Sequence, residues 1–475
     1  MRVALLGAGL AGLGALWWSA ARRPNPPLGV VVITLDTTRA DRLSTYGFHD
    51  VSLPHLERLA REGIVFDQAT TVAPLTLPAH SSLFTGLLPP NHGVRDNADT
   101  ALDDAHTTLA EVLRARGFRT GAFVGSIILG PTRGLKQGFE QYQAVPERDR
   151  QTPEIETRQR RADEVVNDAI RWLDTVGDSR FFLWTHLYDA HRPYDPPEPY
   201  RSKYGHNLYV GEIAFADSQI GRLLQSLEQR HLLDRTVVVV VGDHGEALGA
   251  HGERDHGIFV YEDVLRVPLI IRAPALRPTR VEEIVRLTDV MPTVLELLDV
   301  PLPPADGVSL ASVMDGSKRA LNLEAYSESL YPQRLGWSPL RALREGKFKL
   351  IDAPRPELYD VEDDPAELTN IYDNRRALAE AMTARLAALA RGRDSTSTPR
   401  QGVNSDLQAQ LASLGYLGGA ARHESSGRAS LPDPKDCIGS FWHAQGSTPS
   451  ALSSCGPWHP ADEGDFQPLL PGPGR

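Results

Sequence analysis

Two unbroken runs of apolar, mostly β-branched residues limit what this chain can fold into. They are V-V-V-I-T-L at residues 30–35 and T-V-V-V-V-V at residues 236–241, and an aspartate follows each run within two residues. A strand exposed on one face alternates apolar and polar side chains, whereas an unbroken run is typical of a strand buried on both faces. The two runs therefore predict central strands of a sheet that helices cover on both sides.

Further strands and helices alternate along the rest of the chain. Strands are predicted at 120–124, 181–187 and 267–271, and helices at 53–62, 109–116, 162–175, 210–233 and 288–298. This alternation predicts an α/β fold whose central sheet is mostly parallel and flanked by helices. Such sheets place their chemistry beyond the carboxyl ends of the strands. Asp36 and the pair Asp243-His244 follow the two apolar runs, so we expect them to share one rim of the sheet.

A third contributor to this rim is the stretch from Thr71 to Asn97. Pro78 lies two residues after Thr76 and Gly86 ends the following apolar segment, which predicts a helix that starts near Thr76. The unpaired N–H groups and the dipole at a helix N-terminus favour an alkoxide and a neighbouring phosphate or sulfate. Thr76 is therefore interpreted either as a simple N-cap or as a nucleophile beside a bound anion.

Together, Asp36, Thr76, Asp243 and His244 offer three oxygen donors and one imidazole. This donor set suits one divalent ion, Ca, Mg or Mn, and Zn is also compatible because of the histidine. A metal bound to Thr76 would help to deprotonate its hydroxyl. The alternative is structural, with Asp36 as a strand-end cap and Asp243-His244-Gly245 as a turn.

Length and charge restrict the organisation and the partners of the chain. At 475 residues it is expected to hold about two to three folded units. Its net charge of −11 shows no excess of basic residues of the kind that binds nucleic acid, so nucleic acid is not an expected partner. The only two cysteines, Cys437 and Cys455, lie near the C-terminus and leave the main body without thiol chemistry. They form either a single bridge or a pair of free thiols.

Residues 3–20 are uncharged and largely apolar, with small residues at 19–21. They predict that residues 1–21 form a signal peptide or an N-terminal membrane anchor. The protein is therefore expected to be exported, and to be periplasmic or anchored to the outer face of the inner membrane. The stretch from Gly7 to Gly12 also matches a dinucleotide fingerprint, but it lacks the strand and amphipathic helix that this fingerprint needs.

The C-terminal part differs in composition from the rest. Short antiparallel strands are predicted within 341–351 and at 357–360, and a helix at 377–391, so residues 336–393 are expected to form a small α+β subdomain. Residues 394–475 are rich in Ser, Thr, Pro and Gly and show little periodicity. They are interpreted as a low-complexity, disordered tail.

Several longer motifs resemble those of the sulfatase family within the alkaline-phosphatase-like superfamily. They are L-D-T-T-R-A-D-R-L-S-T-Y-G from Leu35, the Thr76 segment with F-T-G and N-H-G-V-R-D-N, H-L-Y-D-A-H-R-P-Y-D-P-P from His186, G-D-H-G-E from Gly242, and E-L-Y-D-V-E-D-D-P-A-E-L-T-N from Glu357. They follow the family's order from about residue 30 to residue 373. The resemblance implies an alkaline-phosphatase-like fold, with a catalytic domain over residues 28–335.

Three residues depart from the family's pattern. Usual sulfatases carry Cys-x-Pro-x-Arg, or Ser first, and its first residue matures to formylglycine; here the segment is Thr76-Leu77-Pro78-Ala79-His80. Threonine cannot become formylglycine, His80 stands in place of the arginine, and Thr37 in place of the second residue of an Asp-Asp pair. The remaining pattern resembles that of the superfamily's threonine-nucleophile phosphotransferases, which bind one metal and pass through a phosphothreonine.

The resemblance also implies roles for residues outside the metal set. His191 and Asn97 match positions that contact the substrate's anionic oxygens, His80 shares the developing charge, and His256 matches a position facing the leaving group, where it would act as general acid. Arg39 and His186 are expected to be structural.

The chain is thus expected to be a metal-dependent hydrolase of sulfate or phosphate esters, with Thr76 as nucleophile. Its substrate would be a small anionic ester, either free or carried on a glycan or lipid. Two alternatives remain: a membrane-linked transferase of the phosphoethanolamine or phosphoglycerol type, and an inactive anion-binding relative.

Overall fold

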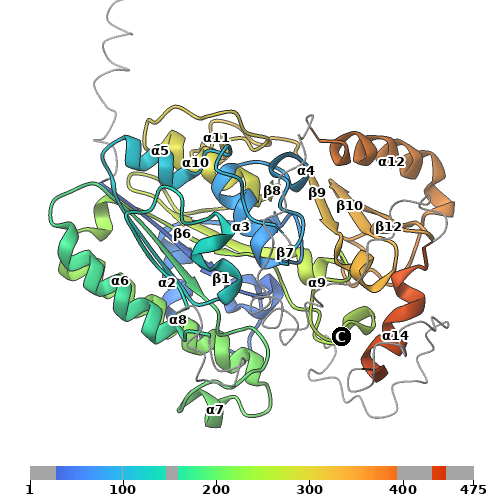
Figure 1. The fold of residues 1–475 in the computed structure, drawn as a ribbon, viewed down its shortest axis with the longest axis horizontal. Coiled ribbons are helices and arrows are strands. Elements are labelled where there is room, and N and C mark those ends of the chain that lie inside the picture. The colour runs from blue at the N-terminus through green and yellow to red at the C-terminus, as the bar shows by residue number, and fades with distance from the viewer. Residues whose placement is uncertain (1–27, 99, 146–158, 393–430, 445–475) are drawn as a thin grey trace, which may run out of the picture.

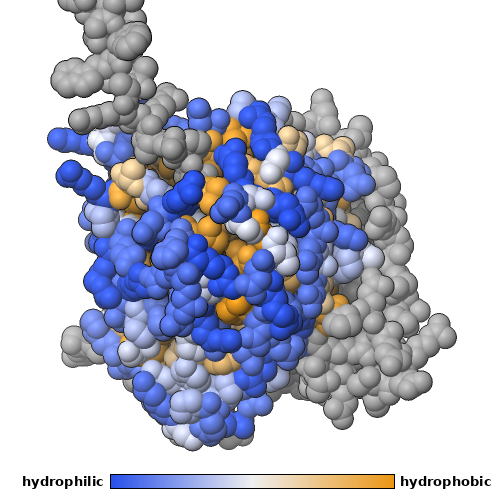
Figure 2. Space-filling view, turned by 90° about the vertical axis from the view of Figure 1, so that its left-hand side faces the viewer, coloured by the Kyte–Doolittle hydropathy of each residue, from blue (hydrophilic) through white to orange (hydrophobic). Residues whose placement is uncertain are grey.

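The computed structural model describes residues 28–98, 100–145, 159–392 and 431–444 (Figure 1). The predicted signal peptide or anchor at residues 1–21 lies outside the described residues, as do Cys455 and most of the predicted tail. Within the described ranges, no helix is both long and apolar enough to cross a lipid bilayer. Figure 2 shows one side of the molecule, where hydrophilic side chains cover most of the surface and apolar atoms form smaller areas among them.

An eight-stranded sheet forms the centre of the molecule, in the order β4-β3-β5-β1-β6-β7-β2-β8. Parallel pairing runs from β4 to β6 and joins β2 to β8, whereas β7 is antiparallel to both of its neighbours. The predicted α/β fold with a mostly parallel sheet is confirmed. The strands are β1 (Gly29–Leu35), β2 (Ile64–Thr70), β3 (Arg119–Val124), β4 (Gln141–Gln143), β5 (Phe181–Leu187), β6 (Thr236–Gly242), β7 (Arg266–Arg272) and β8 (Thr279–Arg286).

Alternate side chains of the central strands enter two separate hydrophobic cores. In β1, Val30 and Val32 belong to one core, and Val31 and Ile33 to the other. The two cores lie on opposite faces of the sheet because successive side chains of a strand point to opposite faces. This explains why the runs in β1 and β6 contain almost no polar residue.

Helices cover both faces of the sheet (Figure 1). Residues of α2 (Pro54–Glu62), α6 (Ala162–Val176) and α8 (Leu208–Gln229) pack into one core. Residues of α3 (Thr76–Thr85), α5 (Leu109–Ala115) and α10 (Val290–Leu297) pack into the other. The shorter helices are α4 (Pro89–His92), α7 (Tyr200–Lys203), α9 (Glu262–Leu265) and α11 (Ala311–Met314).

A second, antiparallel sheet lies beside the first, in the order β12-β11-β10-β9. It comprises β9 (Glu324–Ser329), β10 (Leu340–Glu345), β11 (Phe348–Asp352) and β12 (Glu357–Asp360), and α12 (Arg376–Ala390) contacts it. The small α+β subdomain therefore starts at β9, earlier than the predicted boundary at residue 336, because β9 pairs with β10.

Part of the predicted disordered tail is folded, which corrects that expectation. Helix α14 (Pro434–Ala444) buries Cys437, Ile438 and Phe441. The ring of Phe441 lies edge-on to that of Trp337, with 5.7 Å between their centroids. Charged residues of the helix also contact the small sheet and the turn before β12, since Lys435 pairs with Glu357 and Asp436 with Arg355. These contacts hold the helix in place although the surrounding composition is typical of a tail.

Candidate active site

Helix α3 places Thr76 at its first residue, with the hydroxyl group buried. Leu75 occupies the N-cap position and Thr76 is only 1% exposed. The Thr76 Oγ1 atom lies 3.4 Å from His244 Nε2, its hydrogen-bond partner among the described residues. The simple N-cap interpretation of Thr76 is therefore wrong, and its hydroxyl faces the predicted metal ligands.

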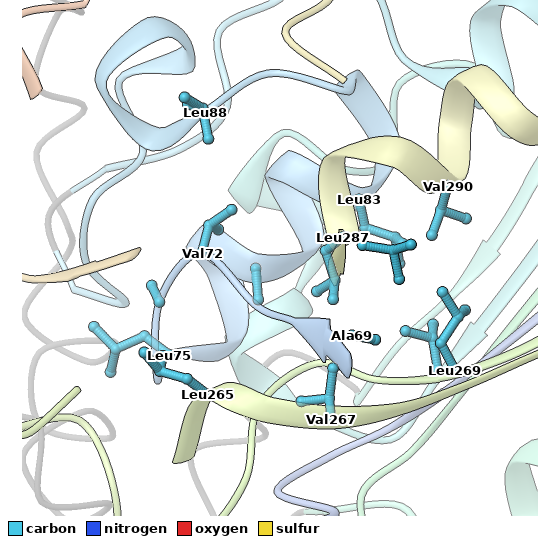
Figure 3. Close-up of a cluster of buried hydrophobic side chains, with 14 of the residues drawn as sticks. Ala69, Val72, Leu75, Leu83, Leu88, Leu265, Val267, Leu269, Leu287 and Val290 are labelled. Carbon is cyan, nitrogen blue, oxygen red and sulfur yellow. The ribbon is translucent and has the colours of Figure 1, made fainter. Parts of the chain in front are cut away.

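Apolar contacts fix the segment that leads into Thr76. Figure 3 shows Leu75 in this segment close to Leu265, the last residue of α9, and both belong with Val72 and with Val267 of β7 to one hydrophobic core. All four side chains are at most 1% exposed. Because the chain on the N-terminal side of Thr76 is packed against a strand of the sheet, the position of the hydroxyl is set by the core of the protein.

Asp36 and Asp243 meet at the carboxyl ends of β1 and β6, as predicted. Asp243 Oδ1 accepts hydrogen bonds from the backbone N–H groups of Thr37, at 3.2 Å, and His244, at 2.7 Å. Thr37 adopts a φ of 49° and donates its hydroxyl to the Ala190 carbonyl at 2.7 Å. Thr37 thus points its oxygen away from the two carboxylates and adds no ligand where the family pattern has an aspartate.

The backbone partner of His244 determines which of its two ring nitrogens carries the hydrogen. Its Nδ1 lies 3.0 Å from the Gly245 carbonyl oxygen, which can only accept, so Nδ1 carries the hydrogen. The neutral ring then presents the Nε2 lone pair to Thr76 and the carboxylates. A Cβ at Gly245 would lie 2.1 Å from the Asp263 carbonyl oxygen, so this close approach requires glycine.

The buried carboxylates fit a metal ion. Both oxygens of Asp36 and the Oδ2 of Asp243 are buried and have no hydrogen-bond partner in the part of the chain that the structure describes. Ligand atoms of Asp36, Asp243 and His244 all lie within 4.8 Å of one another. Buried carboxylates without partners are costly unless a cation compensates them. We conclude that Asp36, Asp243 and His244, with the Thr76 hydroxyl beside them, can hold one divalent ion.

Burial shifts the pKa of each of these groups in the direction that favours its neutral form. It raises the pKa of Asp243 to about 7, with a further contribution from the nearby Asp36 carboxylate, and it also raises the pKa of Asp36. Burial lowers the pKa of His244 to about 3. Without a cation, therefore, the carboxylates tend to hold a proton and the imidazole is neutral.

His80 lies one helical turn after Thr76, but it does not face a substrate. Its Nδ1 is 2.7 Å from the Thr76 carbonyl oxygen, and its Nε2 is 3.0 Å from the Thr34 hydroxyl. Burial lowers the pKa of His80 to about 3. Both ring nitrogens are thus used inside the protein, and the ring is neutral. The expectation that His80 shares the developing charge on a substrate is corrected: His80 is a positioning residue for the start of α3.

Asn97 caps α3 from outside the helix. Its Oδ1 accepts the backbone N–H of Leu77 at 2.8 Å, while its buried Nδ2 has no hydrogen-bond partner among the described atoms. An amide that is fixed through its oxygen and leaves a buried N–H₂ group unpaired is suited to bind an anionic oxygen beside Thr76. The contact of Asn97 with a substrate oxygen stays a prediction.

His191 and His256 form the other wall of the site, with ring centroids 5.0 Å apart. The His191 Nδ1 donates to the Arg192 carbonyl at 2.6 Å, and its ring stacks on Tyr188. Burial lowers the pKa of both histidines to about 4. The His256 ring also lies 4.5 Å from that of His244, so the structure brings both predicted residues to the metal ligands.

Glu246 is a site residue that sequence reasoning missed. Its Oε1 lies 3.0 Å from His256 Nδ1, and Tyr194 donates its hydroxyl to Oε2 at 3.1 Å. Glu246 is fully buried, and burial raises its pKa well above the usual range. A proton held by Glu246 would be donated to His256 Nδ1, and the hydrogen of the neutral His256 ring would then lie on Nε2. In the sequence, Glu246 is indicated only by its place as the last residue of the motif G-D-H-G-E.

Comparisons with known proteins agree with this geometry. The sulfatase family model matches residues 29–300, which is more than half of the chain. The chain belongs to the sulfatase family. A second model, the C-terminal region of N-sulphoglucosamine sulphohydrolase, matches residues 249–392. The chain is therefore an ester hydrolase, and the predicted family and enzyme class are confirmed.

Individual relatives share little sequence identity with this chain, but their similarity extends over most of its length. An uncharacterized sulfatase, YidJ of Escherichia coli (strain K12), is 25% identical over 75% of this chain and 84% of its own length. The choline-sulfatase of Rhizobium meliloti (strain 1021) is 27% identical over 70% of this chain and 79% of its own length. The solved phosphonate monoester hydrolase of Agrobacterium radiobacter has a TM-score of 0.65 at 24% identity, covering 77% of this chain and 95% of that one. This last likeness concerns the fold.

Proposed function

We propose that this member of the sulfatase family is a metal-dependent hydrolase that uses Thr76, and no formylglycine, as its nucleophile. The observation that carries this proposal is the buried Thr76 hydroxyl, 3.4 Å from His244 Nε2, together with three carboxylate oxygens of Asp36 and Asp243 that have no hydrogen-bond partner among the described residues. Asp36, Thr76, Asp243 and His244 would hold the ion. When bound, the ion would supply the positive charge that lowers the pKa of the hydroxyl and offsets charge on the ester oxygens.

The protein's own residues account for the remaining requirements of the reaction. The Thr76 hydroxyl loses its proton to water, and its Oγ1 forms a bond to the central phosphorus or sulfur while the bond to the leaving oxygen breaks. Asn97 donates its free N–H₂ group to a non-bridging oxygen. His256 gives its Nε2 hydrogen to the leaving oxygen, and Glu246 stabilises the proton left on the pair. Water then bonds to the phosphorus or sulfur and returns a proton to the His256–Glu246 pair while the bond to Thr76 Oγ1 breaks. This step releases sulfate, a phosphate monoester or a phosphonate, according to the substrate.

The charge of the site favours a monoanionic ester. All ion pairs described for Asp36 and Asp243 are with histidine rings, and burial lowers the pKa of each of these rings. The nearby Arg39 is occupied by Asp41 and Asp263. One divalent ion would only balance the two carboxylates, so a second negative charge on the substrate would lack a partner. Sulfate monoesters, phosphodiesters and phosphonate monoesters carry a single charge, whereas a phosphate monoester carries about two near neutral pH.

Among these esters, turnover through Thr76 favours phosphorus over sulfur, because water can hydrolyse a phosphoester of threonine and so restore the free hydroxyl. The relatives include a choline-sulfatase, and the similar solved structures include a phosphonate monoester hydrolase. The test should therefore include both sulfate esters and phosphonate esters. The natural substrate would be a small anionic ester, free or carried on a glycan or lipid.

A substrate panel tests this proposal. The metal-free full-length protein is assayed with 4-nitrophenyl sulfate, 4-nitrophenyl phosphate, bis(4-nitrophenyl) phosphate and 4-nitrophenyl phenylphosphonate, each with Mg, Ca, Mn or Zn added back. We expect activity only with metal, and higher kcat/KM for the phosphodiester or phosphonate than for the phosphate monoester. Equal activity with and without a chelator, or a clear preference for the phosphate monoester, would contradict the proposal.

A further inference from the structure

A solvent-exposed ion pair lies beside His191 and His256, the two histidines that form one wall of the site. Arg192 Nη1 donates to Asp255 Oδ1 at 2.6 Å, and each of these two residues is the chain neighbour of one of the histidines. The histidine rings are buried and 5.0 Å apart, whereas the side chains of Arg192 and Asp255 are 49% and 29% exposed. The two loops therefore meet twice, through the rings inside the site and through the ion pair at its outer edge.

The loop that carries Arg192 is held on both sides of this residue. On the N-terminal side, the Ala190 carbonyl accepts the hydroxyl hydrogen of Thr37 at 2.7 Å. On the C-terminal side, Tyr194 donates its hydroxyl to the buried Glu246 at 3.1 Å. Arg192 lies between these two contacts, so the backbone places its side chain at the edge of the site.

The guanidinium group of Arg192 uses one of its three nitrogens and leaves two available. Nη1 bonds to Asp255, and neither Nε nor Nη2 bonds to any residue that the structure describes. Nε and Nη2 together form the edge of a guanidinium that binds a carboxylate or a phosphate through two parallel hydrogen bonds. Because the ion pair already restrains the side chain, an anion that binds to this edge orders fewer rotatable bonds.

The place of Arg192 relates this free edge to the leaving group of the substrate. His256 is the proposed donor of a hydrogen to the leaving oxygen, so the leaving group lies on the side of the site that His191 and His256 form. We propose that Arg192 is a specificity-determining residue, which binds an oxyanion such as a carboxylate on the leaving group. This inference rests on the proposed function, because it takes His256 as the general acid.

The preferred substrates are then monoanionic esters of an alcohol that itself carries an acidic group. The charge on the reacting ester and the charge on the leaving group have different partners. The first faces the metal ligands, and the second lies outside them, at the exposed edge where Arg192 supplies a positive charge. The single charge favoured for the reacting ester is therefore unchanged.

Two variants separate recognition of an anion from a structural role of the ion pair. Arg192→Gln and Asp255→Asn both remove the ion pair, but only Arg192→Gln removes the cation. If the pair only joined the two loops, both variants would affect esters with charged and uncharged leaving groups alike. If Arg192 binds an anion, the two variants change the preference for a charged leaving group in opposite directions.

The metal-loaded full-length protein is assayed with two phenylphosphonate esters. Both have a 4-nitrophenol leaving group, which carries a carboxylate at its 3-position in one ester and an uncharged carboxamide in the other. We expect the carboxylate ester to have the higher kcat/KM, by up to about fivefold, and this ratio to decrease as salt is added. Arg192→Gln should abolish the preference, whereas Asp255→Asn should increase it because the cation loses a competing anion.

Arg201→Gln is the matched control. Arg201 on α7 pairs with Asp195 at the same distance of 2.6 Å, and its side chain is 53% exposed, close to the value for Arg192. Removing this second ion pair should leave the ratio of the two kcat/KM values as in wild type. Circular dichroism confirms that each variant folds.

Equal kcat/KM values of the wild type for the two esters would overturn the assignment, and so would a preference that Arg192→Gln retains. If Arg192→Gln does not fold, the decision falls to Asp255→Asn: an increased preference supports recognition by Arg192, and an unchanged or decreased one overturns it. A wild-type protein that hydrolyses neither ester with any of the added metals would refute the proposed function and this inference with it. Hydrolysis of both esters at the same rate would refute only the inference.

Discussion

The hydroxyl of Thr76 is the residue on which the proposed chemistry depends most directly. Replacing it with alanine removes both the attacking atom and one proposed ligand, so we expect Thr76→Ala to lower kcat by about three orders of magnitude or more. Thr76→Ser keeps the hydroxyl at the start of α3 and should retain measurable activity. Steady-state kinetics of both variants, with circular dichroism to confirm folding, provide the measurement. Wild-type turnover by Thr76→Ala would exclude Thr76 as the nucleophile.

Asp243 should make metal binding dependent on pH. Burial and the neighbouring Asp36 raise its pKa to about 7 in the metal-free protein, so an ion that binds below this pH must displace a proton. Apparent Mn affinity should therefore increase by up to about tenfold per pH unit toward pH 7, and level off above it. Calorimetry in two buffers of different ionisation enthalpy measures both the affinity and the released proton.

The raised pKa of Asp243 should also make the folding stability of the metal-free protein depend on pH. The folded metal-free protein holds this proton more tightly than the unfolded chain, so its stability should fall as pH rises from the usual pKa of 3.8 toward 7. Saturation with metal should remove this decline. An affinity that does not vary between pH 5.5 and pH 7 would contradict the proposed role of Asp243.

At the scale of single elements, β11 and α9 are joined by a buried ion cluster. Lys349 on β11 is 1% exposed, and its Nζ lies 3.1 Å from Glu262 and 2.9 Å from Glu367. Lys349→Met would leave the buried Glu367 without its cation and Glu262 with Arg344 alone, at 3.4 Å, and we expect it to cost about 3–5 kcal/mol of unfolding free energy. Denaturant titration of the metal-free protein measures this loss.

Lys347 provides a matched control on the same hairpin. Its side chain is 41% exposed and pairs with Asp360 at 2.5 Å, where solvent screens the interaction. Lys347→Met should leave the denaturation midpoint nearly unchanged. If Lys349→Met is no more destabilised than this control, the buried cluster does not stabilise the contact between α9 and the small sheet.

The elements that could be predicted from the sequence are those with an unbroken pattern. β1, β5 and β6 have almost the predicted bounds because both of their faces are buried. Strand β2 was missed because Asp67 and Gln68 interrupt its apolar run, where its pairing with both neighbours shifts register. Strand β8 was missed because it lies at the edge of the sheet and exposes charged residues.

The site was predictable to a similar extent. Asp36 and Asp243 could be placed together because parallel strands end on one rim, and Thr76 because its helix starts there. The role of His80 could not be predicted in this way. It depends on the bonds of its two ring nitrogens to the Thr76 carbonyl and the Thr34 hydroxyl, which no spacing in the sequence encodes.

At the scale of the whole molecule, the small sheet holds the loops on both sides of the site. Ser327 and Glu328 of β9 donate to the carbonyl groups of Thr71, at 2.6 Å, and Val72, at 2.9 Å, in the segment before Thr76. Ser329 donates to the carbonyl of Gly257, next to His256. The C-terminal subdomain therefore holds the segments that carry Thr76 and His256, the proposed nucleophile and general acid, although it contributes neither residue.

Helix α14 reaches the same loop from the C-terminal side. Lys435 pairs with Glu357, and Glu357 accepts the hydroxyl of Tyr261 at 2.8 Å in the loop that follows His256. The helix is anchored by the contact of Phe441 with Trp337. Undocking α14 would remove the cation beside Glu357 and loosen this loop, so it should impair turnover without removing any metal ligand.

Phe441→Ala tests this connection. Loss of a buried phenylalanine costs about 3 kcal/mol or more in a well-packed core, so we expect a lower denaturation midpoint and a several-fold lower kcat, with unchanged metal content. Ser440→Ala, at the neighbouring and only partly buried position, is the control and should match wild type. The effect should be larger for esters with poor leaving groups, because these depend most on a well-placed His256. Destabilisation without any loss of turnover would mean that α14 stabilises the small sheet but does not position the active site.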